Sequence, residues 1–107
     1  MKREAALKYA KDDLWSIHME WLLENKPDLV KRLFEKDRNQ LLMYLSRKTH
    51  QGATLEFNLQ EKGLPRDQIE ELVLGQVIAP PPPENPPEPL PEPLVNRIRI
   101  WADNLTE

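Results

Sequence analysis

The chain has 107 residues, of which 15 are Lys or Arg, 18 are Asp or Glu and none is Cys, and its net charge is −3. This length limits the chain to one compact domain of ordinary size. The absence of Cys excludes disulfide bonds, a thiol nucleophile and Cys-ligated metal centres. No run of 18 apolar residues is present and the N-terminus lacks a signal-peptide core, so we expect a cytoplasmic protein with no membrane partner.

Residues 2–24 carry apolar side chains at alternating steps of three and four, which is typical of one face of an amphipathic helix. The stripe consists of Leu7, Ala10, Leu14, Ile17 and Trp21. Pro27 ends this helix and starts a short second one, because the residue before proline avoids the helical region. A third helix is predicted from about Arg38 to Lys62, with a kink or short loop near Gly52, since glycine disfavours a helix interior.

Gly63 suits the left-handed cap that ends many helices, and Pro65 suits the first turn of a fourth helix that reaches about Ile78. The sequence therefore predicts an all-α fold with a small four-helix bundle over residues 1–78. A proline-rich linker over 79–94 and a C-terminal docking segment over 95–107 complete the predicted organisation.

The linker has nine prolines among its sixteen residues. Proline fixes φ and lacks the N–H that helices and sheets need, so polyproline II is expected here. Its P-x-x-P spacings also allow a ligand for an SH3- or WW-type groove. The acidic flanks Glu84, Glu88 and Glu92 favour a spacer instead.

The segment after the linker is rich in large apolar residues that need a surface to pack on. Its spacing favours a short amphipathic helix, although Ile98 and Ile100 alternating with arginines also suit an edge strand. We expect this segment to dock on an apolar groove of the same chain, of a second copy of the chain or of a protein partner, and the sequence leaves these three alternatives open. The candidate partner-binding residues are Trp15, Trp21, Ile98, Ile100, Trp101 and Leu105. For Trp15 and Trp21, a wide buried stripe within the bundle is the alternative.

No sequence motif indicates catalysis or cofactor binding. His18 and His50 lack metal-ligand partners at helical spacing and are expected at the surface or its boundary. The glycines are isolated, so no phosphate-binding loop is formed, and neither serine lies in a nucleophile elbow. We therefore expect no enzymatic activity, catalytic residue, metal, cofactor or small-molecule substrate.

A nucleic-acid-binding role is the competing hypothesis. Residues 59–74 resemble a helix-turn-helix with Gly63 in the turn, but the acidic side chains of the second helix would repel phosphates. The basic N-terminal half offers another route for a small DNA-binding regulator. Its candidate phosphate contacts are either Lys2, Arg3, Lys8 and Lys11 or Lys31, Arg32, Lys36 and Arg38.

Two stretches resemble a known family. The run 21–29, with Leu33 after it, and the later run 68–72 that leads to Val77 and Ile78 are similar to small helical accessory proteins of bacterial transposons and prophages, the TnpV-like type. The resemblance implies a phage or mobile-element accessory factor and carries over no functional residue. The expected function is non-enzymatic protein binding, as an adaptor that binds a host protein or forms a homo-oligomer.

Overall fold

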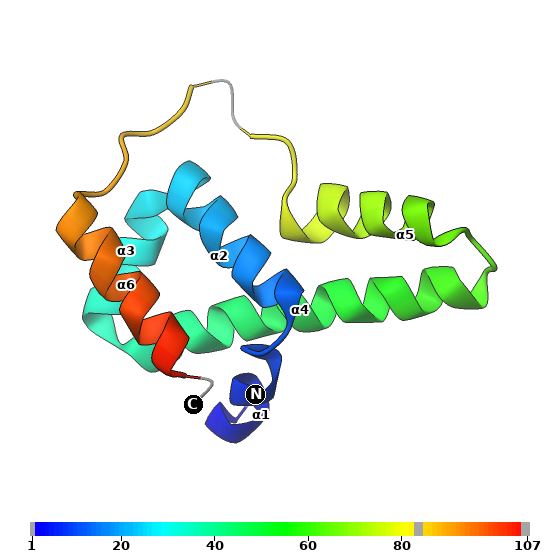
Figure 1. The fold of residues 1–107 in the computed structure, drawn as a ribbon, viewed down its shortest axis with the longest axis horizontal. Helices are drawn as coiled ribbons and strands as arrows, with labels where there is room; N and C mark the ends of the chain where they lie inside the picture. The colour runs from blue at the N-terminus through cyan, green and yellow to red at the C-terminus, as the bar shows by residue number, and fades with distance from the viewer. Residues whose placement is uncertain (1, 83–84, 106–107) are drawn as a thin grey trace.

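The computed structural model describes residues 2–82 and 85–105, and this part of the chain contains helices and no strand. The predicted all-α class is confirmed. The elements in chain order are α1 (Arg3–Tyr9), α2 (Asp13–Asn25), α3 (Pro27–Lys36), α4 (Arg38–Glu61), α5 (Arg66–Val73), the π-helical turn η1 (Leu74–Ile78) and α6 (Glu92–Asn104) (Figure 1). None of the helices in the described part is both long and apolar enough to cross a membrane.

The single helix predicted over residues 2–24 is wrong, because the chain breaks between α1 and α2. Asp12 has an extended backbone, and its carboxylate accepts a hydrogen bond from the Leu14 N–H at 2.9 Å. This contact satisfies one of the free N–H groups at the start of α2, so Asp12 acts as an N-cap. Five α-helices and a π-helical turn therefore occupy residues 3–78, where four helices were predicted.

The break also changes which face of α2 is buried. The predicted apolar stripe crosses from α1 to α2, and two separate helices do not share one face. The spacing between Ala10 and Leu14 therefore does not predict which side of α2 is buried. The buried face of α2 contains Trp15, His18, Met19, Leu22 and Leu23. Ile17, a member of the predicted stripe, is 41% exposed.

Helix α4 has 24 residues and a length of about 36 Å, and it runs without a break through Gly52. The predicted kink is absent. Instead of breaking the helix, Gly52 allows neighbouring side chains to pack closely against α4. A Cβ at Gly52 would lie 3.0 Å from Cδ1 of Ile78 and 3.3 Å from Cδ1 of Leu14. The missing side chain lets η1 and α2 approach the middle of α4.

The α4–α5 connection follows the predicted turn chemistry. Gly63 has φ of +80°, which glycine adopts without the Cβ clash of other residues. Pro65 precedes α5 as its N-cap. The predicted fourth helix loses α-helical geometry after Val73 and ends as η1, where the Ala79 N–H donates to the Leu74 carbonyl at 2.6 Å.

The apolar side chains form two clusters joined by α4. The larger one contains buried residues of α1, α2, α3, the first half of α4 and α6, and the smaller one is built from Ile69, Val73 and Ile78 beside Leu55 and Leu59. Helix α5 and the second half of α4 run side by side and extend away from the larger cluster (Figure 1). The radius of gyration is 14.4 Å, larger than the roughly 13 Å of a compact chain of this length.

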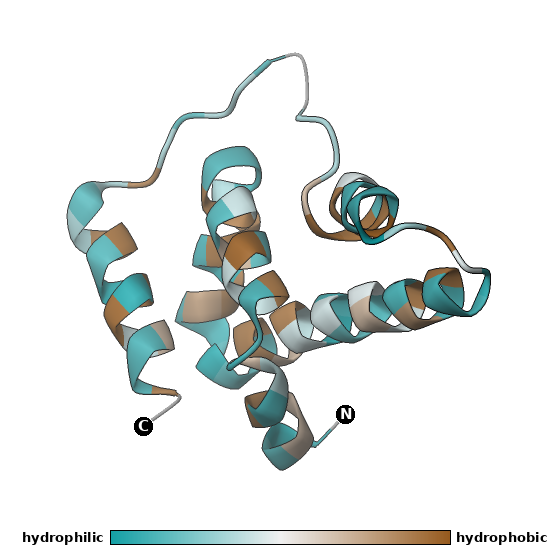
Figure 2. Ribbon diagram, turned by 45° about the vertical axis from the view of Figure 1, so that its right-hand side comes forward, coloured by the Kyte–Doolittle hydropathy of each residue, from teal (hydrophilic) through white to brown (hydrophobic). Residues whose placement is uncertain are grey.

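The linker leads from η1 over the molecule to α6 (Figure 1). Its described residues 79–82 and 85–91 form neither helix nor strand, while Pro83 and Glu84 lie outside the described residues, as do Thr106 and Glu107 of the docking segment. Helix α6 begins at Glu92, so the last three residues of the predicted linker are helical. Hydrophobic and hydrophilic residues alternate around α6 as in an amphipathic helix, and the strand alternative is wrong (Figure 2).

Candidate functional site

The C-terminal helix docks on its own chain. Ile98 is completely buried, and Ala102 is 7% exposed. The ring of Trp101 lies 6.3 Å from that of Trp15 and 5.8 Å from that of Phe34, the latter in an edge-to-face arrangement. Side chains of α2 and α3 therefore receive α6, and no second copy is needed to bury this segment.

An ion pair accompanies these apolar contacts. Nη2 and Nε of Arg99 donate to the two carboxylate oxygens of Glu20 at 2.9 and 3.2 Å. The Glu20 contact raises the pKa of Arg99 above its ordinary value. Both side chains are about half exposed, so water screens the pair and its contribution is small. The apolar side chains thus supply most of the stability of the docked helix.

The candidate partner-binding residues are divided between interior and surface. Trp15 is 2% exposed, which matches the alternative of a buried stripe, and Trp21 is half-buried and donates from Nε1 to the carbonyl of Pro80 at 3.0 Å. Leu105 is half-buried. Ile100 is 59% exposed and does not share the contact surface of Ile98, because two residues along a helix turn a side chain by about 200°.

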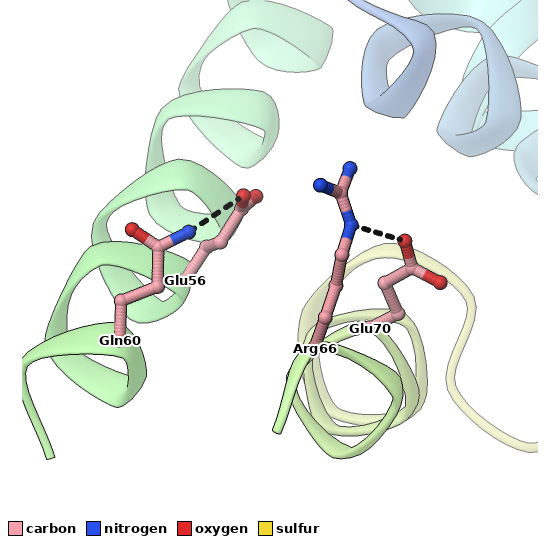
Figure 3. A network of polar contacts seen from close by, with 4 residues as sticks. All are labelled: Glu56, Gln60, Arg66 and Glu70. Carbon is pink, nitrogen blue, oxygen red and sulfur yellow. Dashed lines mark hydrogen bonds and ion pairs between the residues drawn. The ribbon is translucent and has the colours of Figure 1, made fainter. Parts of the chain in front are cut away.

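A cleft lies between the start of α2, the second half of α4 and α5. Its volume is about 610 Å³. The apolar lining consists of Leu14, Ile17, Leu64, Ile69, Val73 and Leu74, and the polar lining consists of Asp12, Asp13, Glu56, Gln60, Arg66 and Glu70. In Figure 3 the polar side chains of α4 and α5 rise between the two helices on the side where α2 lies. The cleft thus combines an apolar floor with a charged rim.

The charge of this rim is mainly negative, since four carboxylates face one guanidinium. Nε of Arg66 contacts Oε1 of Glu70 at 3.4 Å, and Nε2 of Gln60 contacts Oε1 of Glu56 at the same distance. Arg66 and Glu70 are 90% and 62% exposed, so their ion pair is weak. These long, exposed contacts leave the carboxylates ready to pair with an incoming cation.

His18 lies inside the molecule, so the position predicted for it, at the surface or its boundary, is wrong. Its side chain is 2% exposed and stacks beside the rings of Trp21 and Tyr44. Nδ1 lies 2.7 Å from the carbonyl of Ile78, which can only accept, so Nδ1 carries the proton and Nε2 does not. Nε2 has no hydrogen-bond partner in the described part of the chain.

Burial lowers the pKa of His18 below its ordinary value of 6.5, and the positive charge of Lys48 acts in the same direction, against the opposing effect of the Ile78 hydrogen bond. The histidine is therefore a neutral structural link between α2 and the end of η1. His50, in contrast, is exposed, and its Nδ1 lies 2.7 Å from the hydroxyl of Tyr9.

The second set of candidate phosphate contacts lies on and next to α3. Lys31, Arg32 and Lys36 are exposed on that helix. The guanidinium of Arg38 lies over the ring of Phe34, 4.8 Å from its centre, as in a cation–π contact. The described residues include no group of three or more His, Asp or Glu side chains that could hold a metal ion.

Sequence reasoning did not find the cleft. Its polar residues come from three separate segments of the chain, and only the packing of α5 against α4 and α2 brings them together. The one available signal was the adjacent pair Asp12 and Asp13, which by itself is typical of any helix start.

No protein-family model, curated protein or solved structure matches this chain. The resemblance of residues 21–78 to TnpV-like accessory proteins therefore stays a prediction.

Proposed function

We propose that this chain is a non-enzymatic protein-binding module whose cleft between α2, α4 and α5 receives a basic amphipathic helix of a partner protein. The observation that carries this proposal is the combination of six apolar residues and four carboxylates around one cleft. An amphipathic helix that enters a groove buries apolar side chains at spacings of three and four and leaves its charged flanks at the rim.

Exposure of the apolar lining supports a protein partner. Ile17 is 41% exposed at the cleft, although it belongs to a helix whose other large apolar residues are half-buried or buried. Leu14, Leu64 and Leu74 are only half-buried. An apolar surface of this kind gains from being covered by a partner, since burial contributes about 25 cal/mol per Å² of apolar area.

Charge complementarity supports a basic partner. Lysine or arginine residues that flank the apolar face of the incoming helix would pair with Asp13, Glu56 and Glu70. Such pairs add about 0.2–1 kcal/mol each at exposed positions and speed association at low salt. Within this proposal, the chain serves as an accessory factor of a bacterial phage or mobile element, as the resemblance implies.

A fluorescently labelled 18-residue helix of leucine and lysine, with leucine confined to one face, provides the first test. We expect fluorescence anisotropy to show micromolar binding that weakens as salt rises. Glu70→Lys should weaken binding by up to about thirtyfold, because it replaces an attractive contact of at most about 1 kcal/mol by a repulsive one of similar size. Ile17→Ser should also weaken binding through loss of apolar contact.

Glu35→Lys is the matched control, because Glu35 is exposed on α3 and does not line the cleft. It changes the net charge by the same amount as Glu70→Lys and should leave the affinity within about twofold at 150 mM salt. Equal weakening by the two substitutions, or no binding of the peptide up to millimolar concentration, would refute the cleft as the binding site.

A further inference from the structure

Three arginines from three helices line one cavity near the start of α4, whose other end leads to α5. Arg3 of α1, Arg38 of α4 and Arg97 of α6 line a cavity of about 500 Å³. The remaining lining residues are Asn39, Ile100, Trp101, Asn104 and Leu105, so no carboxylate is among the described residues that line it. Three like charges around one cavity repel one another unless an anion joins them.

Two of the three arginines, Arg3 and Arg38, are oriented by contacts that leave donors available. Nε of Arg3 donates to Oδ1 of Asn39 at 3.2 Å, which leaves its terminal N–H groups available. Arg38 is held over the Phe34 ring. In the described part of the chain, the two ion pairs are Arg66–Glu70 and Arg99–Glu20, so none of the three cavity arginines belongs to one.

Three carboxylates are each adjacent in sequence to a lining residue, and none of them lines the cavity: those of Glu4, Asp103 and Asp37. Asp37 lies directly before α4. Its Oδ1 accepts a hydrogen bond from the Asn39 N–H at 2.9 Å and thereby caps the helix. The positive end of the α4 helix dipole lies at its first turn and adds to the positive charge of the arginines. The electrostatics of the cavity therefore favour an anion with several acceptor oxygens.

We propose that this cavity binds a phosphate group, either of free phosphate compounds or of a single-stranded nucleic acid. The planar guanidinium presents paired donors that match two phosphate oxygens. The half-buried Trp101 and the exposed Ile100 at the cavity offer apolar surface to a group attached to the phosphate. The site is independent of the cleft proposed above, with which it shares no lining residue.

Helix α6 completes this site, because Arg97 and Trp101 reach the cavity only when α6 is docked. A ligand that binds the docked form alone stabilises that form by mass action. Phosphate binding and docking of the C-terminal helix are therefore linked.

Two probes test the proposal on the full chain at 50 mM salt: pyrophosphate by titration calorimetry, and a labelled ten-nucleotide oligothymidylate by fluorescence anisotropy. Binding of pyrophosphate alone would assign the site to free phosphate compounds, and binding of the oligonucleotide would assign it to a nucleic-acid strand. Raising the salt to 200 mM should weaken oligonucleotide binding about tenfold or more, if three phosphate contacts are made.

Arg97→Gln and Arg47→Gln remove the same charge at two exposed positions, the first in the cavity and the second on α4 outside it. Arg97→Gln should weaken binding of the active probe about tenfold or more, since a hydrogen bond to a charged group is lost. Arg47→Gln should change it less than about threefold. Equal weakening by both variants, or no binding of either probe at millimolar concentration, would overturn the proposal.

Discussion

Replacement of Ile98 by alanine tests whether α6 is held on the rest of the chain by its apolar face. Ile98 of α6 is fully buried and belongs to the larger apolar cluster. Truncation of a buried isoleucine to alanine costs about 2–5 kcal/mol, through lost transfer free energy and the cavity left behind. The substitution cannot lower the stability of the chain by more than the free energy with which α6 docks. Beyond that loss, α6 detaches and stays attached to the chain only through the linker.

Ile100→Ala is the matched control on the same helix. Ile100 is 59% exposed, so its truncation should change stability by less than about 0.5 kcal/mol. The helix propensity changes equally in both variants, because each replaces isoleucine by alanine. The difference between the two therefore reports burial alone.

Urea denaturation and limited trypsin digestion measure the two effects. Trypsin cleaves after Arg97 and Arg99 within α6, and a docked helix protects these bonds. Each 1.4 kcal/mol lost from docking raises the detached population about tenfold as long as docking is favourable. Ile98→Ala should therefore increase the cleavage rate at least tenfold and Ile100→Ala should not. Equal rates for the two variants would show that α6 does not dock through Ile98.

Two further predictions concern the junction of α2, α4 and η1. The lowered pKa of His18 means that the folded state disfavours the proton, so its contribution to stability is complete above pH 6.5 and declines as the pH falls below that value. Urea denaturation at pH 7.5 and 5.5 should show this decline, and His18→Phe should reduce it; an unchanged pH dependence in the variant would contradict the assignment. Gly52→Leu should lower the free energy of unfolding by about 1–3 kcal/mol through overpacking against Ile78, whereas Gly75→Leu, where a Cβ meets nothing within 4 Å, should not. Similar unfolding midpoints for the two leucine variants would exclude close packing at Gly52.

Local signals were sufficient for part of the fold. Pro27 separates α2 from α3, and Gly63 takes the left-handed conformation at the end of the α4–α5 turn. These residues restrict their own backbone angles, so their effect is readable without knowledge of the tertiary structure. The amphipathic spacing of α6 likewise predicted a helix with one buried face, and the same spacing puts Ile100 about 200° from Ile98, on the other face.

Signals that depend on tertiary contacts were not readable. The cap at Asp12 competes with a continuous apolar stripe from Leu7 to Trp21, and the stripe gave the wrong result. Gly52 looked like a helix breaker because its packing partner, Ile78, lies 26 positions later in the chain. His18 was assigned to the surface or its boundary for the same reason, since its hydrogen-bond partner is the carbonyl of that isoleucine. The cleft and the arginine cavity are assembled entirely from such distant segments.

Leu14 and Trp15 are neighbours on α2, yet they pack into different apolar clusters, Leu14 into the smaller and Trp15 into the larger. The first turn of α2 therefore contributes side chains to both apolar clusters, so neither cluster can lose this turn without the other losing it too. For residues 3–78, thermal melting should then be a single cooperative transition, with both clusters lost at the same temperature.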